Sequence, residues 1–122
     1  MKTIAYNLFY DTIDRISEQT KEDGFPTFKK AIDNLQPSVE VRSRRIGGAN
    51  FQIPTEVRPT RKLALAFKWL ISYAKERNGR SMADKLAAEM IAAAKGEGAA
   101  FKKKEDVHKM AEANKAFAHF RV

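Results

Sequence analysis

Residues 38–57 restrict the fold of this chain most, because there a helical pattern gives way to two extended runs. The run from Ser38 to Ile46 is followed by Gly47-Gly48 and then by a second run that ends at Val57. Two consecutive glycines supply the positive φ angles that both central positions of a type I′ turn require. The sequence therefore predicts a two-stranded hairpin, and Pro54 limits its strand to an edge or an arm.

Apolar residues elsewhere in the chain recur at the spacing of amphipathic helices. The first helix is expected over residues 3–18, and a second, short one begins at Pro26 and ends before Pro37. A long helix is expected from Arg58-Pro59 to Asn78-Gly79. Its core-facing residues are expected to be Leu63, Ala66, Phe67, Leu70, Ile71 and Ala74.

Two more helices are expected after the break at Asn78-Gly79. Ser81 is the predicted N-cap of one that ends at Gly96 and Gly98. A final helix is expected from Glu105 to about His119, with its acidic start at the positive end of the helix dipole. No long linker divides the chain, so residues 1–122 are predicted to form one domain. Its predicted fold class is mainly α, a compact helical domain with an inserted, projecting β-hairpin.

The charge of the chain is concentrated in its middle third. Net charge is +8, and residues 40–80 carry ten basic and three acidic side chains, whereas residues 1–39 carry five and six. A surface that serves only solubility mixes the two signs, so this concentration indicates a polyanionic partner.

Several functional classes are excluded by what the sequence lacks. There is no cysteine, no phosphate-binding loop of the GxxxxGK type and no recognisable nucleophile beside a base. His108 and Glu112 have a metal-ligand spacing without a recognisable third ligand. We therefore expect no enzyme activity, no metal, no cofactor and no small-molecule substrate. No run of about 18 apolar residues and no secretory signal is present, so a cytoplasmic protein without a membrane partner is expected.

The hairpin arginines are the strongest candidates for an RNA contact. Pairing across a two-residue turn sets Arg44 beside Phe51 and Arg42 beside Ile53, while Arg45 lies on the opposite face. Arginines this close to a projecting tip repel one another unless phosphate neutralises them. Arginine also donates paired hydrogen bonds to phosphate, and an aromatic ring can stack on a base. Arg42, Arg44, Arg45 and Phe51 are therefore predicted to bind RNA.

A second basic surface is expected along the long helix. Arg61, Lys68 and Lys75 recur every seven residues and so line one exposed stripe. Trp69 borders this stripe, and packing at the helix edge is favoured over stacking on a base. The remaining predicted RNA contacts are Lys2, Arg58, Lys62, Arg77, Arg80, Lys102, Lys103, Lys104, Lys109 and Lys115.

Three segments resemble bacterial small-subunit ribosomal protein seven: PSVEVRSRRIGG, FQIPTEVRPTRK and KKKEDVHKMAEANKAFAHFR. Together they extend in order over nearly the whole chain. The resemblance implies a helical domain with an inserted hairpin that binds the 3′ major domain of the small-subunit rRNA and nucleates assembly of the head. It also implies a position near the exit-site tRNA and neighbouring head proteins. Members of that family normally carry a basic arm and a further helix ahead of the region that this chain enters at about Lys2.

Two other interpretations stay open at this point. A basic β-arm with an apolar wedge is also used by architectural DNA-binding proteins that bend the minor groove. Residues 61–77 are similar to a calmodulin-type target helix, which would make the chain an interaction module. Burial of that helix in the intact fold would argue against the second interpretation.

Overall fold

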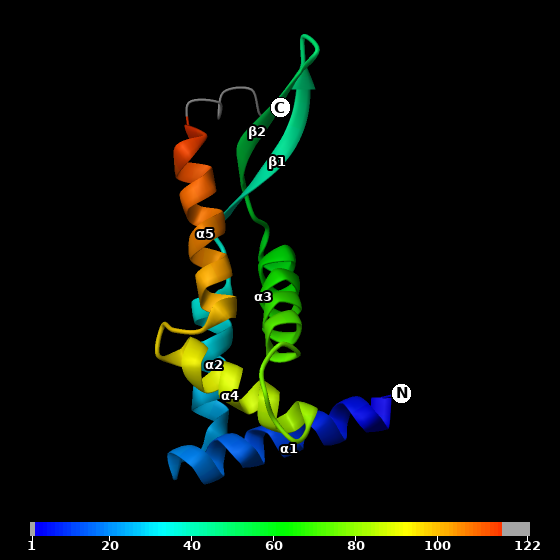
Figure 1. Ribbon diagram of the computed structural model, residues 1–122, viewed down its shortest axis with the longest axis vertical. Helices are drawn as coiled ribbons and strands as arrows, with labels where there is room; N and C mark the ends of the chain where they lie inside the picture. The colour runs from blue at the N-terminus through cyan, green and yellow to red at the C-terminus, as the bar shows by residue number, and fades with distance from the viewer. Residues whose placement is uncertain (1, 116–122) are drawn as a thin grey trace.

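The computed structural model describes residues 2–115, which form five helices and one antiparallel hairpin (Figure 1). In chain order these are α1 (Lys2–Thr20), α2 (Gly24–Leu35), β1 (Val39–Ile46), β2 (Ala49–Glu56), α3 (Pro59–Ala74), α4 (Met82–Ala94) and α5 (Ala99–Ala113). The predicted fold class, mainly α with an inserted hairpin, is confirmed. That residues 1–122 form one domain stays a prediction.

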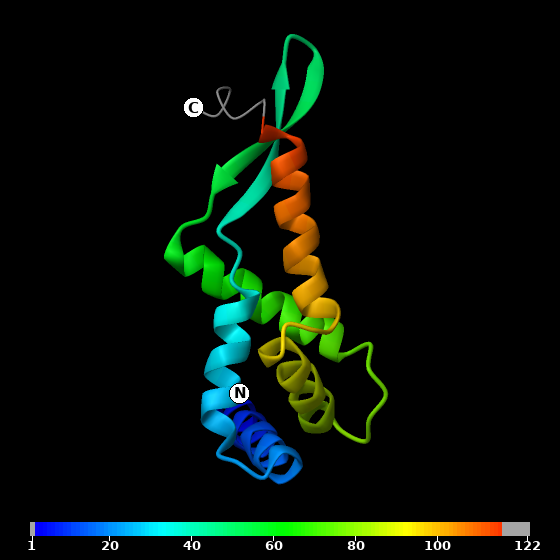
Figure 2. The ribbon, with the colours of Figure 1, turned by 90° about the vertical axis from the view of Figure 1, so that its left-hand side faces the viewer.

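A shared hydrophobic core receives a buried side chain from every helix. Ile16 of α1, Leu35 of α2, Leu70 of α3, Met90 of α4 and Val107 of α5 all belong to this cluster. The hairpin leaves the helices at one end, and α1 crosses the other end (Figures 1 and 2). The hairpin tip therefore projects away from the core that holds its base.

The hairpin has the predicted turn and register. Gly47 and Gly48 have φ angles of 58° and 85°, which L side chains adopt at a cost. The strands pair Arg44 with Phe51, Arg42 with Ile53 and Arg45 with Asn50, as expected. At the base, Ile53, Pro54 and Val57 are buried, while the residues of the turn are exposed.

The buried side of α3 differs from the predicted one. Leu63, Phe67 and Ile71 were expected in the core but are 45%, 39% and 42% exposed. Leu65 and Trp69 are buried instead. The apolar surface of this helix is wider than its contact with its neighbours, so spacing alone did not show which part is covered. Three predicted positions are confirmed as buried: Ala66, Leu70 and Ala74.

The start of α4 follows the prediction, whereas the start of α5 does not. Ser81 accepts a hydrogen bond from the backbone N–H of Asp84 at 3.3 Å, which confirms it as the N-cap of α4. In contrast, α5 begins at Ala99 behind Gly98, so the predicted start at Glu105 is wrong. Lys102, Lys103 and Lys104 therefore lie within α5 rather than before it. The predicted end of this helix near His119 lies outside the described residues.

Candidate nucleic-acid interface

The hairpin presents its three arginines to solvent beyond the buried base. Arg42 and Arg44 lie on the same face of β1, and Arg45 lies on the opposite face, because successive side chains of a strand point to opposite sides. All three side chains are exposed, and Phe51 is half-buried. Charged groups of one sign thus cover both faces of the projecting segment.

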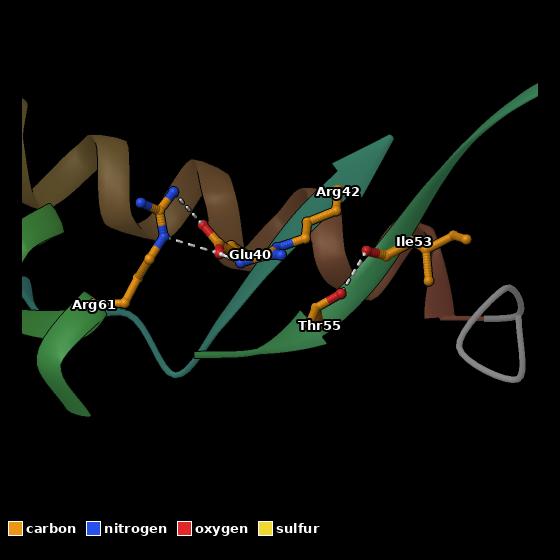
Figure 3. A network of polar contacts seen from close by, with 5 residues as sticks. All are labelled: Glu40, Arg42, Ile53, Thr55 and Arg61. Atoms are coloured by element: carbon orange, nitrogen blue, oxygen red, sulfur yellow. Dashed lines mark hydrogen bonds and ion pairs between the residues drawn. The ribbon is translucent and has the colours of Figure 1, made fainter. Parts of the chain in front are cut away.

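Glu40 joins the hairpin to α3 at the base of this basic segment (Figure 3). Arg61 of α3 donates from Nε and Nη2 to the two carboxylate oxygens of Glu40, each at 3.2 Å. Nη2 of Arg42 lies 3.5 Å from the same carboxylate. On β2, the Thr55 hydroxyl donates to the carbonyl of Ile53 at 3.4 Å, as Figure 3 also shows. Two predicted RNA-binding arginines thus share one carboxylate.

Glu40 was not among the residues predicted for this surface, although one feature of the sequence could have identified it. Glu40 is the only acidic residue in the first strand, and strand alternation places it on the same face as Arg42. An acidic residue within a segment this basic calls for a partner. Which arginine outside the strand provides that partner was not visible in the spacing.

A pocket of about 490 Å³ lies between the hairpin base and the first turn of α3. Its lining residues are Glu40, Arg42, Thr55, Glu56, Val57, Arg58, Thr60 and Arg61. The positive end of the α3 dipole points to the same region, because Pro59 opens the helix. The hairpin and the α3 stripe therefore meet at a junction that combines three arginines with two carboxylates.

The predicted stripe on α3 is exposed along its length. Arg61, Lys68 and Lys75 face solvent, and Arg58 and Arg80 are exposed at the two ends of the region. Lys62 is half-buried, and Trp69 packs in the core as favoured by the sequence. Lys2 starts α1, which crosses the end of the molecule opposite the hairpin, so the fold does not bring it to the hairpin arginines (Figure 1).

Arg77 has a structural partner that the sequence did not reveal. Glu89 of α4 is only 1% exposed, and it accepts from Nε of Arg77 at 3.0 Å and lies 2.9 Å from Nη2. The same carboxylate accepts from the backbone N–H of Ala100 at 3.2 Å. Arg77 therefore neutralises a buried charge that joins the segment after α3 to α4 and α5. Its predicted contact with RNA stays a prediction.

The lysines of α5 fall into exposed and half-buried positions. Lys102 and Lys109 of α5 are exposed, whereas Lys103 and Lys104 are half-buried; Lys115, which follows the end of the helix, is also exposed. Lys104 lies 3.5 Å from the carboxylate of Glu105 and 5.1 Å from the centre of the Phe101 ring. The basic positions on α5 thus differ in how much of each lysine can reach a partner.

His108 links the hairpin base to α5. Its Nε2 accepts from the backbone N–H of Ser38 at 3.1 Å. Burial lowers the pKa of His108, the nearby Lys104 lowers it further, and Glu105 acts in the opposite direction. Among residues 2–115, no group of three or more His, Cys, Asp or Glu side chains could hold a metal ion. The imidazole therefore serves as a neutral acceptor in this fold.

The described residues define a helical fold that presents a basic hairpin beside a basic helix face. No helix in the described part of the chain has the length and apolar character needed to cross a bilayer. Residues 1–115 match the family described as Ribosomal protein S7p/S5e. The chain belongs to this family.

Curated relatives agree with the family match. The chain is 60% identical over 120 residues to the small ribosomal subunit protein uS7 of Cytophaga hutchinsonii. The matched region covers 98% of this chain and 77% of the relative. It is 58% identical to the protein of that name from Salinibacter ruber, with 98% and 76% covered. The corresponding protein of Magnetococcus marinus is 54% identical, with 98% and 77% covered. The resemblance inferred from the three sequence segments is confirmed.

Family membership decides between the functional classes that the sequence left open. The chain is a structural, non-enzymatic constituent of the small ribosomal subunit, an RNA-binding ribonucleoprotein component that acts in translation within the cytoplasmic ribosome. The comparisons give no support to the architectural DNA-binding alternative. Burial of Leu65, Trp69 and Leu70 in the core of the intact fold argues against the interpretation of residues 61–77 as a calmodulin-type target.

Proposed function

We propose that this protein binds the 3′ major domain of the small-subunit rRNA, nucleates assembly of the head, and lies beside the exit-site tRNA and neighbouring head proteins. One observation carries the proposal: the ten basic residues of positions 40–80 lie largely on the hairpin and on the exposed side of α3, and these two surfaces meet at Glu40. A continuous basic surface of this kind follows a phosphate backbone.

The proposed contacts divide into two groups by chemistry. Arginines on the hairpin and at the start of α3 donate paired hydrogen bonds to phosphates, and Phe51 offers a ring edge or face to a base. Lysines add point charges that position the RNA without reading its sequence. The proposed RNA-binding residues are Lys2, Arg42, Arg44, Arg45, Phe51, Arg58, Arg61, Lys62, Lys68, Lys75, Arg77, Arg80, Lys102, Lys103, Lys104, Lys109 and Lys115.

The test replaces the three hairpin arginines, Arg42, Arg44 and Arg45, with alanine and measures binding to a 3′ major domain fragment of small-subunit rRNA. Each arginine is expected to contribute about 1–3 kcal/mol to the complex through charge-assisted bonds. Thermal unfolding is expected to stay nearly unchanged, because these side chains lie outside the core. Lysine replacements should recover only part of the loss, since an ammonium lacks the bidentate fork.

A matched control removes the same charge elsewhere. Lys29, Lys30 and Lys95 are exposed and lie outside the proposed surface, so their triple alanine variant lowers the net charge by the same amount. This control is expected to bind the rRNA fragment much more tightly than the hairpin variant does. Equal affinities for the two variants, or loss of the fold in the hairpin variant, would place the recognition surface elsewhere.

Salt and substrate preference provide a second test. The logarithm of the binding constant should fall with the logarithm of salt concentration by about 0.7–0.9 for each phosphate contact. The protein should also prefer folded rRNA to duplex DNA of equal length, because A-form shape and 2′-hydroxyls distinguish RNA. A flat salt response, or equal affinity for both nucleic acids in competition at one salt concentration, would contradict the proposal.

A further inference from the structure

An acidic side chain lies at the centre of the proposed RNA-binding surface. Residues 40–80 contain three acidic side chains, Glu40, Glu56 and Glu76. Within the described residues, the ion pairs made by these three acids are those of Glu40 with Arg61 and with Arg42. Only 12% of the Glu40 side chain is exposed, whereas Glu56, which lines the same pocket, faces solvent. Glu40 is thus held in place by the arginines around it.

The contact between Glu40 and Arg61 joins two elements that the chain does not join directly. Glu40 lies on β1, and Arg61 lies 21 residues further along the chain on α3. Both carboxylate oxygens accept from the guanidinium at 3.2 Å, so the pair restricts orientation as well as distance. The angle between the hairpin and α3 is therefore fixed at this junction.

A small change of this angle is amplified at the tip of the hairpin. From Glu40 to Gly47 the strand rises by about 3.3 Å per residue, which gives a lever of roughly 20 Å. A rotation of about 10° at the junction then moves the tip by roughly 4 Å, more than the length tolerance of a hydrogen bond. Arginines near the tip and cations on α3 can meet one RNA surface together only if this angle is held.

We propose that Glu40 is a positioning residue for RNA recognition: it holds Arg61 so that the hairpin and the α3 stripe face the rRNA in one fixed arrangement. This inference rests on the proposed function. Preorganisation favours binding because the hairpin need not be ordered during association. Glu40 acts through the arginines, and its own carboxylate makes no favourable contact with phosphate.

Charge alone predicts the opposite effect, which makes the proposal testable. Replacing a glutamate by glutamine removes one negative charge, so the net charge of the protein rises by one. If attraction to phosphate decides affinity, loss of either Glu40 or Glu56 should tighten binding to rRNA. If Glu40 positions the hairpin, its loss should weaken binding although the charge becomes more favourable.

The experiment compares Glu40→Gln with its matched control Glu56→Gln in binding to the 3′ major domain rRNA fragment. Glu56→Gln is expected to bind as tightly as the wild type or tighter. Glu40→Gln is expected to bind about tenfold more weakly, because the hairpin must then be ordered on binding. Should Glu40→Gln fail to fold, Glu40→Asp keeps the charge, withdraws it by one methylene and is expected to weaken binding as well.

A double-mutant cycle separates positioning from a general structural role. In an Arg44→Ala/Arg45→Ala background the hairpin has lost cations that need placing, so the further loss caused by Glu40→Gln should be much smaller. Binding of Glu40→Gln that equals or exceeds that of the wild type would overturn the inference, as would an undiminished loss in the double-alanine background. Failure of the wild type itself to bind the rRNA fragment would instead refute the proposed function, and this inference with it.

Discussion

The buried carboxylate of Glu89 depends on Arg77, and replacing Arg77 with alanine tests this dependence. The Glu89 side chain is 1% exposed and would keep the backbone N–H of Ala100 as a donor at 3.2 Å. Removing one partner of a buried ion pair costs about 3–5 kcal/mol, because the other charge stays buried without compensation. The Arg77 side chain is 36% exposed, so water reaches this site from its side. We therefore expect a loss at the lower end, about 3 kcal/mol.

This loss of stability can be measured by thermal unfolding, with circular dichroism as the signal. For a domain of this size, 3 kcal/mol corresponds to a decrease in Tm of about 10 °C. Adding Glu89→Gln to Arg77→Ala should restore much of the stability, since a neutral amide still accepts from Ala100 and no buried charge is left. Arg80→Ala is the control: Arg80 is exposed, so its Tm should stay within about 2 °C of the wild type.

Two outcomes would refute this reasoning. A Tm of Arg77→Ala close to that of Arg80→Ala would show that the carboxylate does not need the guanidinium. A double variant no more stable than Arg77→Ala alone would show that the loss does not come from the buried charge. The double variant also tests the proposed RNA contact of Arg77, because it lacks the guanidinium while keeping most of the fold.

Three further predictions concern the core and the hairpin base. The pKa of His108 is lowered in the fold, so its contribution to stability should be complete above pH 6.5 and be lost as the pH falls through the lowered pKa. Replacing it in His108→Gln should therefore make the stability to unfolding depend less on pH between pH 5 and 7. An equally strong pH dependence in the variant and the wild type would contradict this. Trp69 is the only tryptophan and is buried, so its fluorescence should shift to the red on unfolding and stay unchanged when rRNA binds, and a change on binding would support base stacking. A Cβ at Gly24 would lie 2.5 Å from the carbonyl oxygen of Ile13, so Gly24→Ala should destabilise the fold by about 1–3 kcal/mol. At Gly79 an added Cβ would lie 3.1 Å from Cγ of Lys85, a milder contact than the one at Gly24, so Gly79→Ala should cost much less stability. Equal stability of the two glycine variants in urea unfolding would refute the argument.

The hairpin and the start of α4 could be predicted from the sequence because short-range chemistry determines them. Gly47 and Gly48 permit one tight turn, and a two-residue turn fixes which residues face each other along both strands. Ser81 caps α4 through a hydrogen bond to a residue three positions away. The clustering of basic residues in positions 40–80 likewise needed no coordinates, and it already indicated a polyanionic partner.

The tertiary structure alone decided which side of α3 is buried and which charges meet. Leu63 and Leu65 are equally apolar, and only the packing of neighbouring helices left the first exposed and buried the second. The partners of Arg61 and Arg77 are 21 and 12 residues away on other elements. Spacing within one element describes that element, whereas a contact between two elements depends on how both are oriented in the packed core. For this reason the sequence by itself determined the hairpin and indicated the negative charge of its partner. The tertiary structure determined how Glu40 and Arg61 hold the hairpin against α3.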